Sequence, residues 1–411
     1  MSVLITDASK RAALAAIRSI GSKGVEVTAT SDETNCAGFL SKYAARKVVT
    51  TNPQVDSEKF LDEIEKELRA KKQDCLFPIH DFSLIPVLKE KKRFDALTSV
   101  PFCDFKTFEK TWDKEETLKV AKLANVPIPK TMTVTSHKEV EKLSDVDFEY
   151  PVVVKPASQT QVEDKGAKTS YVSSKNYCNS IKDAQLMASQ IVSDSGKALI
   201  QEYIQGKGVG VAALFNKGKP RALFSYKRVR EYPITGGPST LRESTDDYKL
   251  KEYARSLLEK LKWHGLAMVE FKQTPTGKYY LMEINGRFWG SVALAINSGV
   301  DFPYLLYEMG TQGDIEEVTN YKVGVLQKWL LPGDVLHFGA KFKKEKLASK
   351  PGVALDFVKS IFEPASEDYI SLDDPLPAFG ALKTGAGYFA NFIAGKRTMS
   401  GEYKKEKKVK H

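Results

Sequence analysis

The sequence lacks any apolar run close to the ~18 residues that a membrane span requires, so we expect neither a spanning helix nor a membrane partner. It enters an apolar, strand-like segment at Val3, which argues against a secretory signal. Cysteine is scarce and forms no CxxC pair, which argues against a zinc site and a disulfide framework. We therefore expect a cytoplasmic protein with reduced thiols at Cys36, Cys75, Cys103 and Cys178.

Two common nucleotide-binding motifs are also absent. The turn after the first apolar segment, Thr6–Arg11, has no GxGxxG pattern, which disfavours a dinucleotide site there. Neither GxxxxGKS nor GxxxxGKT occurs, which excludes a P-loop. The segment Gly206–Gly210 is rich in glycine but has the wrong spacing, and we interpret it as a tight turn before a strand.

What the chain does contain is typical of a soluble protein with two or three domains, since 411 residues exceed one ordinary core. Hydrophobic residues make up 42% and charged residues 28%. The net charge is +10, and residues 395–411 contribute +5 of it through seven bases and two acids. We interpret this segment as a solvated, disordered tail. Nucleic-acid binding is unlikely, because aromatic residues are not interleaved with its bases.

Apolar strands alternate with amphipathic helices over residues 1–105, which predicts an open parallel α/β domain. His80 follows one of these strands, at the end where α/β sheets gather ligands. A structural role for this histidine is nevertheless favoured.

Two glutamates carry the clearest chemical signal. Glu270 and Glu283 lie in strand-like apolar runs separated by Thr274–Gly277, which is typical of a hairpin turn. If Thr276 and Gly277 form a two-residue turn, with Pro275 opposite Lys278, the two glutamates face each other across the ladder. Mg²⁺ would neutralise such a pair, since it prefers carboxylate and amide oxygens. Asn285 and Arg287 add an amide oxygen and a phosphate-binding guanidinium; a solvated acidic hairpin is the alternative.

Polar residues at two other strand ends could bind a nucleotide. Lys155 ends an apolar strand beside the polar segment 157–170, which we interpret as a mobile loop carrying Lys168. The backbone of Gln201–Ile204 (Gln201, Glu202, Tyr203 and Ile204) suits an adenine edge, although an ordinary core strand explains it equally well.

A substrate-binding segment is suggested further along. Arg228 and Arg230 lie two residues apart, so in a regular strand they share one face and could bind a carboxylate. Gly236 and Gly237 expose backbone N–H groups to an anion. A surface strand with a tight turn is an equally good interpretation.

The order of five segments resembles the ATP-grasp superfamily, and within it the carboxylate–amine ligases, with carbamoyl phosphate synthetase and biotin carboxylase as relatives. The resemblance covers roughly residues 1–310 and implies an α/β fold. In it, the parallel domain (1–105) precedes a two-lobed ATP-grasp core of antiparallel sheets and helices (106–310), with a lid subdomain at about 150–205. We expect a C-terminal α+β extension over 311–394, in which strands and turns are evident, and the tail at 395–411. The five segments are Asp113-Lys114, Val154-Lys155-Pro156, Gln201–Ile204, Val269–Phe271 and Met282–Arg287.

The resemblance also implies roles for individual residues. Lys114, Lys155 and the lid residue Lys168 would contact ATP phosphates, and Arg287 would stabilise the transferring phosphate. The segment Gln201–Ile204 would hold the adenine. Glu270, Glu283 and Asn285 would bind Mg²⁺ or Mn²⁺. Related proteins carry an acidic residue for the ribose near the position of Lys207, so this contact has no evident candidate.

These roles imply an ADP-forming ligase that activates a small carboxylate as an acyl phosphate and joins it to an amine. A homodimer is possible. One alternative is a carboxylase or a carboxylate kinase-type enzyme of the same superfamily. Another is a non-catalytic nucleotide-binding protein.

Overall fold

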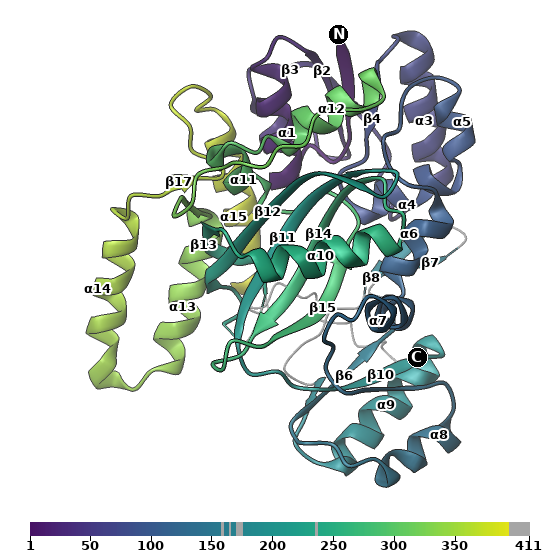
Figure 1. The fold of residues 1–411 in the computed structure, drawn as a ribbon. Coiled ribbons are helices and arrows are strands. Elements are labelled where there is room, and N and C mark those ends of the chain that lie inside the picture. The colour runs from purple at the N-terminus through teal and green to yellow at the C-terminus, as the bar shows by residue number, and fades with distance from the viewer. Residues whose placement is uncertain (158–159, 164–165, 170–175, 235–236, 394–411) are drawn as a thin grey trace, which may run out of the picture.

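The computed structural model describes residues 1–157, 160–163, 166–169, 176–234 and 237–393. The chain begins with a four-stranded parallel sheet in the order β3-β2-β1-β4. Strands and helices alternate as expected, and the helices pack on both faces of the sheet (Figure 1). The elements are β1 (Ser2–Ile5), α1 (Arg11–Gly21), β2 (Glu26–Ser31), α2 (Ala37–Leu40), β3 (Ala44–Val49), α3 (Ser57–Ala70), β4 (Cys75–Phe77), α4 (Asp81–Lys89) and α5 (Lys91–Asp95).

A small lobe follows, built on an antiparallel sheet in the order β5-β10-β6-β9. Its longest helix, α9, begins at the N-cap Ser180, which accepts the N–H of Asp183, and ends at the left-handed Gly196. Val154, Ala188 and Ile200 belong to a hydrophobic cluster confined to this lobe. Helices α6 (Phe105–Trp112) and α7 (Lys114–Leu123) precede the lobe, and their buried residues Phe108 and Ala121 belong to the large hydrophobic cluster described below. The elements of the lobe are β5 (Thr131–Val134), α8 (His137–Glu141), β6 (Val152–Pro156), β9 (Tyr177–Cys178), α9 (Ile181–Ser195) and β10 (Ala198–Glu202).

The largest sheet has seven strands in the order β15-β14-β11-β12-β13-β16-β17. Its apolar residues merge with those of the first domain into one hydrophobic cluster, for example through the rings of Phe77 and Phe288, whose centroids lie 5.8 Å apart. The first domain and the large sheet therefore share a core. The elements are β11 (Lys207–Asn216), β12 (Lys219–Glu231), β13 (Ser239–Thr245), α10 (Tyr248–Lys260), β14 (Gly265–Gln273), β15 (Tyr279–Asn285), α11 (Val292–Ser298), α12 (Phe302–Gln312), β16 (Leu326–Lys328) and β17 (Ser366–Glu367).

The last part of the chain is more helical than its sequence suggested. Three helices, α13 (Val335–Lys344), α14 (Lys350–Ile361) and α15 (Pro377–Ile393), follow β16, so the expectation of mainly strands and turns is wrong. Buried ion pairs attach this extension to the rest of the molecule. Asp368 pairs with Arg242 and with Arg11 (2.7 Å).

Two local expectations also differ from the structure. Residues 160–163 and 166–169 form an antiparallel hairpin of β7 (Thr160–Glu163) and β8 (Gly166–Thr169), where we expected a loop. Gly208 and Gly210 lie inside strand β11 rather than in a tight turn. The α/β fold class, with a parallel domain followed by antiparallel sheets, is confirmed.

Candidate active site

Glu270 on β14 and Glu283 on β15 lie directly opposite each other, as the sequence predicts. The route to this register differs from the expected one. The turn has three residues, because Thr274 rather than Pro275 pairs with Lys278 (N to O, 2.9 Å). A β-bulge at Met282, between the Glu270–Glu283 and Phe271–Leu281 pairs, restores the spacing.

The two carboxylates are balanced by different cations. Arg228 approaches Glu270 to 2.5 Å. Burial, and to a lesser degree repulsion by Glu283, raise the pKa of Glu270. Arg228 acts to lower this pKa but does not reverse the shift. Burial also acts to raise the pKa of Glu283, but Lys114, a hydrogen bond from Asn285 and the charge of Lys155 together lower it. The pair is thus held close together by positive charge from several elements.

Lys114 on α7 and Lys155 on β6 of the small lobe both reach this site. Lys114 is the first residue of α7, directly after the N-cap Asp113, and its N–H donates to Ala157 O (3.0 Å). Lys155 is 8% exposed and donates to Gln201 Oε1 (2.8 Å). Burial, and then repulsion by Lys114, lower the pKa of Lys155 to about 8 against the attraction of Glu283. Both lysines therefore act on the same carboxylate.

Asn285 and Arg287 continue the site at the end of β15. The amide nitrogen of Asn285 donates to Glu283 Oε1 (2.9 Å), and its oxygen accepts from Arg287 (3.1 Å). Arg287 also pairs with Asp81 (2.9 Å), the first residue of α4 in the parallel domain. Asp81, Lys114, Glu283 and Asn285 line one small cavity. The structure thus brings residues from three parts of the chain together.

Asp81 and Glu231 are polar neighbours of the site that the sequence interpretation did not assign. Asp81 follows His80, which forms the N-cap of α4; burial lowers the pKa of this histidine to about 4, consistent with a neutral structural role. Glu231 accepts from Arg228 (3.2 Å). The only signal for Asp81 was its place after a strand of a parallel sheet.

Glycines in β11 make room for the arginine at Glu270. A Cβ on Gly208 would lie 2.8 Å from Cδ of Arg228, and one on Gly210 would lie 2.8 Å from the ring of Tyr226. Gly210 pairs with Tyr226 on one side and with Glu270 on the other. Small residues on this strand therefore let side chains from β12 lie across it toward the carboxylates.

The expectation that Arg228 and Arg230 share one face is wrong. A bulge at Val229 makes Arg228 pair with Arg242 and Arg230 with Leu241, which are consecutive residues of β13. Arg230 therefore points away from Glu270 and binds Asp334 and Glu363 of the extension, each at 2.9 Å.

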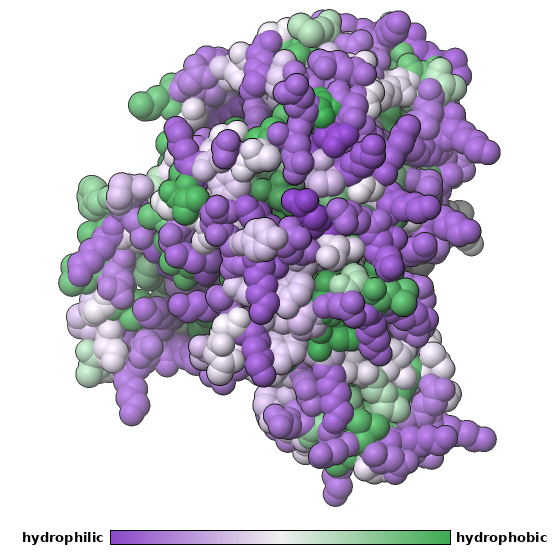
Figure 2. Space-filling view, viewed as in Figure 1, coloured by the Kyte–Doolittle hydropathy of each residue, from purple (hydrophilic) through white to green (hydrophobic). Residues whose placement is uncertain are grey.

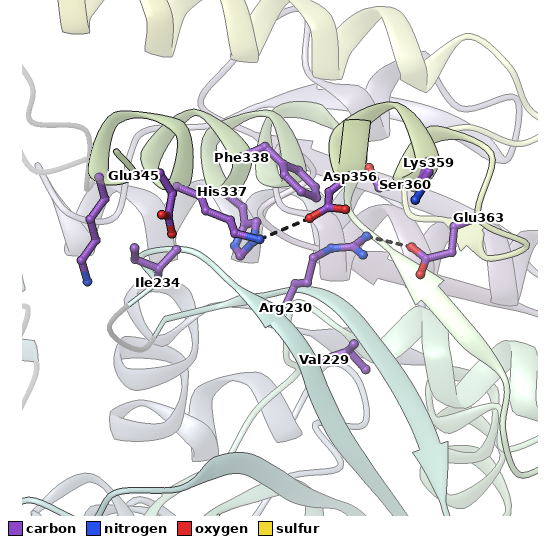
Figure 3. Close-up of a pocket in the computed structure, with 12 residues that line it drawn as sticks. Val229, Arg230, Ile234, His337, Phe338, Glu345, Asp356, Lys359, Ser360 and Glu363 are labelled. Atoms are coloured by element: carbon purple, nitrogen blue, oxygen red, sulfur yellow. Dashed lines mark hydrogen bonds and ion pairs between the residues drawn. The ribbon is translucent and has the colours of Figure 1, made fainter. Parts of the chain in front are cut away.

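Arg230 lines a separate cavity of about 880 Å³ between β12 and the helices α13 and α14. Figure 3 shows Arg230 reaching from the strand toward Glu363, with His337 and Phe338 on the neighbouring helix. Lys341 pairs with Asp356 across the same cavity at 3.5 Å. No sequence motif predicted this cavity.

The remaining predicted residues are placed as follows. Gln201 lies on β10 and bridges Lys155 and Thr131, while the N–H groups of Glu202 and Tyr203 donate to Lys130 O and Pro151 O (3.0 and 3.2 Å). Ile204 follows this strand and is half-buried. Gly237 accepts from Arg228 through its carbonyl (3.2 Å). The side chain of Lys168 and all of Gly236 lie outside the described residues.

The donor set can be tested for its fit to Mg²⁺. Among the described residues, no three or more His, Cys, Asp or Glu side chains gather as a metal site. Glu270, Glu283 and Asn285 offer two half-buried carboxylates and one amide, which are the hard oxygen donors that Mg²⁺ prefers. Burial first, and then the charge of Glu283, disfavour the charged form of Glu270 and raise its pKa despite Arg228. These residues fit a divalent cation that carries its remaining ligands on a bound phosphate.

A family model described as "ATP-grasp in the biosynthetic pathway with Ter operon" matches residues 194–330, the stretch that contains both glutamates. The resemblance of this segment to the ATP-grasp family is thus confirmed. Solved structures are similar to most of the fold. Biotin carboxylase from Campylobacter jejuni superimposes with a TM-score of 0.60 at 18% identity, covering 79% of this chain and 74% of that one.

Two other proteins similar to this chain are named as ligases. L-amino acid ligase from Bacillus licheniformis has a TM-score of 0.55 at 16% identity, covering 77% of this chain and 75% of that one. D-aspartate ligase from Enterococcus faecium (strain Aus0004) is 25% identical over 219 residues, which are 49% of this chain and 50% of that protein. The chain thus spans about half the length of the curated relative that it matches.

Proposed function

We propose that this protein is an ATP- and Mg²⁺-dependent ligase that activates a carboxylate as an acyl phosphate and joins it to an amine, releasing ADP. The observation that carries the proposal is the facing pair Glu270 and Glu283, with Lys114, Lys155 and Arg287 gathered around it. The two relatives named as ligases support amide-bond formation, and an amino acid as one substrate.

In this proposal Glu270, Glu283 and Asn285 hold the metal, which when bound screens the negative charge of the β- and γ-phosphates. Lys155 and Lys114 bind phosphate oxygens, since both ammonium groups lie near Glu283. Lys168 of the β7–β8 hairpin is the proposed third lysine. The segment Gln201–Ile204 holds the adenine.

The residues of the chain act mainly by positioning and charge. Arg287, fixed between Asp81 and Asn285, is placed to stabilise charge on the transferring phosphate. Arg228 is the proposed contact for the acid, together with the backbone of Gly236 and Gly237. We do not extend this role to Arg230, whose guanidinium is engaged by Asp334 and Glu363. Closure of the small lobe and the β7–β8 hairpin would exclude water from the acyl phosphate.

The test is ADP release in the presence of Mg²⁺ with pooled amino acids, other amines and small carboxylates. A substrate-dependent signal that disappears on chelation of Mg²⁺ is expected. Glu283→Gln should slow it by at least ~10³-fold, because a metal ligand is lost while the shape is kept. Exposed Glu259→Gln on α10 is the matched control and should leave the rate unchanged.

Two outcomes would replace the proposal. ADP release that depends on bicarbonate and no amine would favour a carboxylase, the activity named for the Campylobacter jejuni structure. ATP binding without ADP release under any pool would favour a non-catalytic nucleotide-binding protein. Persistent ADP release by Glu283→Gln would contradict the metal role.

A further inference from the structure

The cavity between β12 and the helices α13 and α14 has one wall in a part of the chain that the family model does not match. The model ends at residue 330, and both helices follow it. Among the described helices, none, these two included, is long and apolar enough to span a membrane. The cavity volume of about 880 Å³ falls within the ~300–1,000 Å³ that is typical of small-molecule sites. The helical wall therefore encloses enough space for a small ligand.

This cavity is separate from the candidate active site, although strand β12 contributes to both. Because of the bulge in β12, Arg228 points toward Glu270 whereas Arg230 points into the cavity. Glu231 contacts both sites. Its carboxylate accepts from Arg228 (3.2 Å), and its carbonyl accepts from Nδ1 of His337 (2.8 Å), which lines the cavity. The cavity is thus a second site on the strand that also serves the first.

Three apolar side chains line the cavity. Phe338 of α13 is buried, and its ring centroid lies 5.3 Å from that of Phe357 on α14. Val229 and Ile234 on the facing wall are 47% and 37% exposed, so part of their apolar surface is available to a ligand. On the face seen in Figure 2, apolar and polar residues are interleaved over α13 and α14. The cavity can therefore take up aliphatic side chains of a ligand.

Five of the charged groups at the cavity are paired within the protein. Arg230 binds Asp334, which is fully buried beneath it, and Glu363, each at 2.9 Å. Lys341 lies 3.5 Å from Asp356. These five groups carry two positive and three negative charges. A charged ligand must therefore find its main partners among the groups that remain.

Three charged side chains of the cavity have no such partner. Lys344, Glu345 and Lys359 form no ion pair and no side-chain hydrogen bond among the described residues. Figure 3 shows Glu345 and Lys359 at opposite ends of the cavity, with Phe338 between them. Lys344 precedes Glu345 at the end of α13. One end thus offers a carboxylate beside an ammonium group, and the other end offers a second ammonium group. With the paired groups, four bases and four acids surround the cavity.

We propose that this cavity binds a short peptide that has free termini, an acidic first residue and aliphatic side chains after it. The terminal ammonium group pairs with Glu345, and the acidic side chain pairs with Lys344. The terminal carboxylate pairs with Lys359 at the other end. The aliphatic side chains pack on Phe338 and Ile234 between the two ends.

Two other classes of ligand fit less well. A polyphosphate brings more negative charge than the two ammonium groups can match, and it also meets the carboxylate of Glu345. An uncharged apolar ligand makes no ion pair at either end. The inference is independent of the proposed ligase activity, because peptide binding at this cavity requires neither ATP nor a metal.

The test is calorimetric titration of the full chain with the tripeptide glutamyl-leucyl-leucine, without ATP or Mg²⁺. We expect saturable binding of one peptide per chain. Acetylating the amino terminus, amidating the carboxyl terminus or replacing the first residue by leucine should each weaken binding by about three- to fivefold, because each change removes one ion pair. No saturable binding, or equal affinity for all four peptides, would overturn the proposal and leave the proposed ligase activity untouched.

Two charge reversals on exposed side chains locate the peptide. Lys359→Glu and Glu345→Lys should each weaken binding by about tenfold, because each removes an attraction and adds a repulsion. Lys343→Glu, at an exposed position of α13 that does not line the cavity, is the matched control and should bind normally. In Lys359→Glu the amidated peptide should bind at least as well as the unmodified one, which assigns the carboxylate to this lysine. Circular dichroism checks that each variant folds.

Three further results would contradict the proposal. Binding that survives both charge reversals would place the peptide elsewhere on the protein. Binding that is lost in Glu283→Gln but kept in Lys359→Glu would assign the peptide to the candidate active site. Tripolyphosphate that binds more tightly than the peptide, and is lost with Lys359→Glu, would make the cavity a site for inorganic anions.

Discussion

The large sheet and the small lobe contribute to one site but are held together by different cores. Glu270 and Glu283 lie on strands whose apolar residues share a cluster with the whole parallel domain. Lys155 and Gln201 lie on strands of the small lobe, which has its own smaller cluster. Glu270 and Glu283 thus belong to one hydrophobic core, and Lys155 belongs to the other. We therefore expect local opening of the small lobe to leave the core beneath Glu270 and Glu283 intact.

The largest effect is expected on the large-sheet side, from Arg228→Met. This change leaves Glu270, whose side chain is only 16% exposed, beside Glu283 without its guanidinium and should cost about 3–5 kcal/mol of unfolding free energy. Chemical denaturation measures it. Added Mg²⁺ should restore part of the loss.

Lys227→Met is the control for that prediction, because the Lys227–Glu243 pair is more exposed, at 43% and 28%, and should contribute less than ~1 kcal/mol. Equal losses in the two variants would show that the carboxylate pair needs no cation.

The separation of the cores can be tested with Ile200→Ala in the small lobe. Removing these buried methyl groups should cost about 2–5 kcal/mol. Hydrogen exchange should show faster opening confined to the small lobe. Leu266→Ala on β14 should instead accelerate exchange in the large sheet and the parallel domain together. Uniform acceleration by Ile200→Ala would mean that the two bodies unfold as one.

Lys155→Met tests what the small lobe contributes to nucleotide binding. Loss of the buried ammonium should weaken ATP binding by about 10- to 100-fold, as measured by calorimetry. Lys182→Met, at an exposed position of α9, should bind ATP normally. A normal affinity for Lys155→Met would remove this lysine from the phosphate site.

A smaller effect is expected from pH. The pKa of Lys155 is lowered to about 8, so its ammonium form is lost as pH rises through that value. ATP affinity should fall by about tenfold between about pH 7 and about pH 9. Lys155→Arg should give a flat profile, because the guanidinium stays charged.

The lowered pKa of Lys155 makes folding stability depend on pH in the opposite direction to ATP affinity. The unfolded side chain has the ordinary, higher pKa, so the unfolded state binds more protons in the window between the two values. Stability therefore rises with pH there. A fall of stability across this window that Lys155→Arg abolishes would contradict the assignment.

Much of this site could be predicted because the strands alternate regularly and their residue types are distinctive. Glu270 and Glu283 were placed opposite each other although the turn was wrong by one residue, since the bulge at Met282 compensates. No second irregularity offsets the bulge at Val229, so the side chain of Arg230 lies on the opposite face from the predicted one. Bulges depend on cross-strand packing, which a single strand's sequence does not encode.

Contacts between residues far apart in the sequence also could not be predicted. Arg287 meets Asp81 from 206 residues away, and its binding to the parallel domain follows from how that domain packs on the large sheet. The helical extension was missed because apolar residues and lysines are mixed along α13 and α14. Its inward-facing carboxylates become evident only with their partners, as Asp368 does with Arg242.

The irregular residue at Met282 has a consequence for how this hairpin can change. The bulge at Met282 lies between the two glutamates and the turn of the hairpin. A loss or gain of one residue in the turn can therefore be matched by a loss or gain of one residue at the bulge, and Glu270 and Glu283 stay paired. Length variation at the tip of β14 and β15 is then compatible with unaltered chemistry.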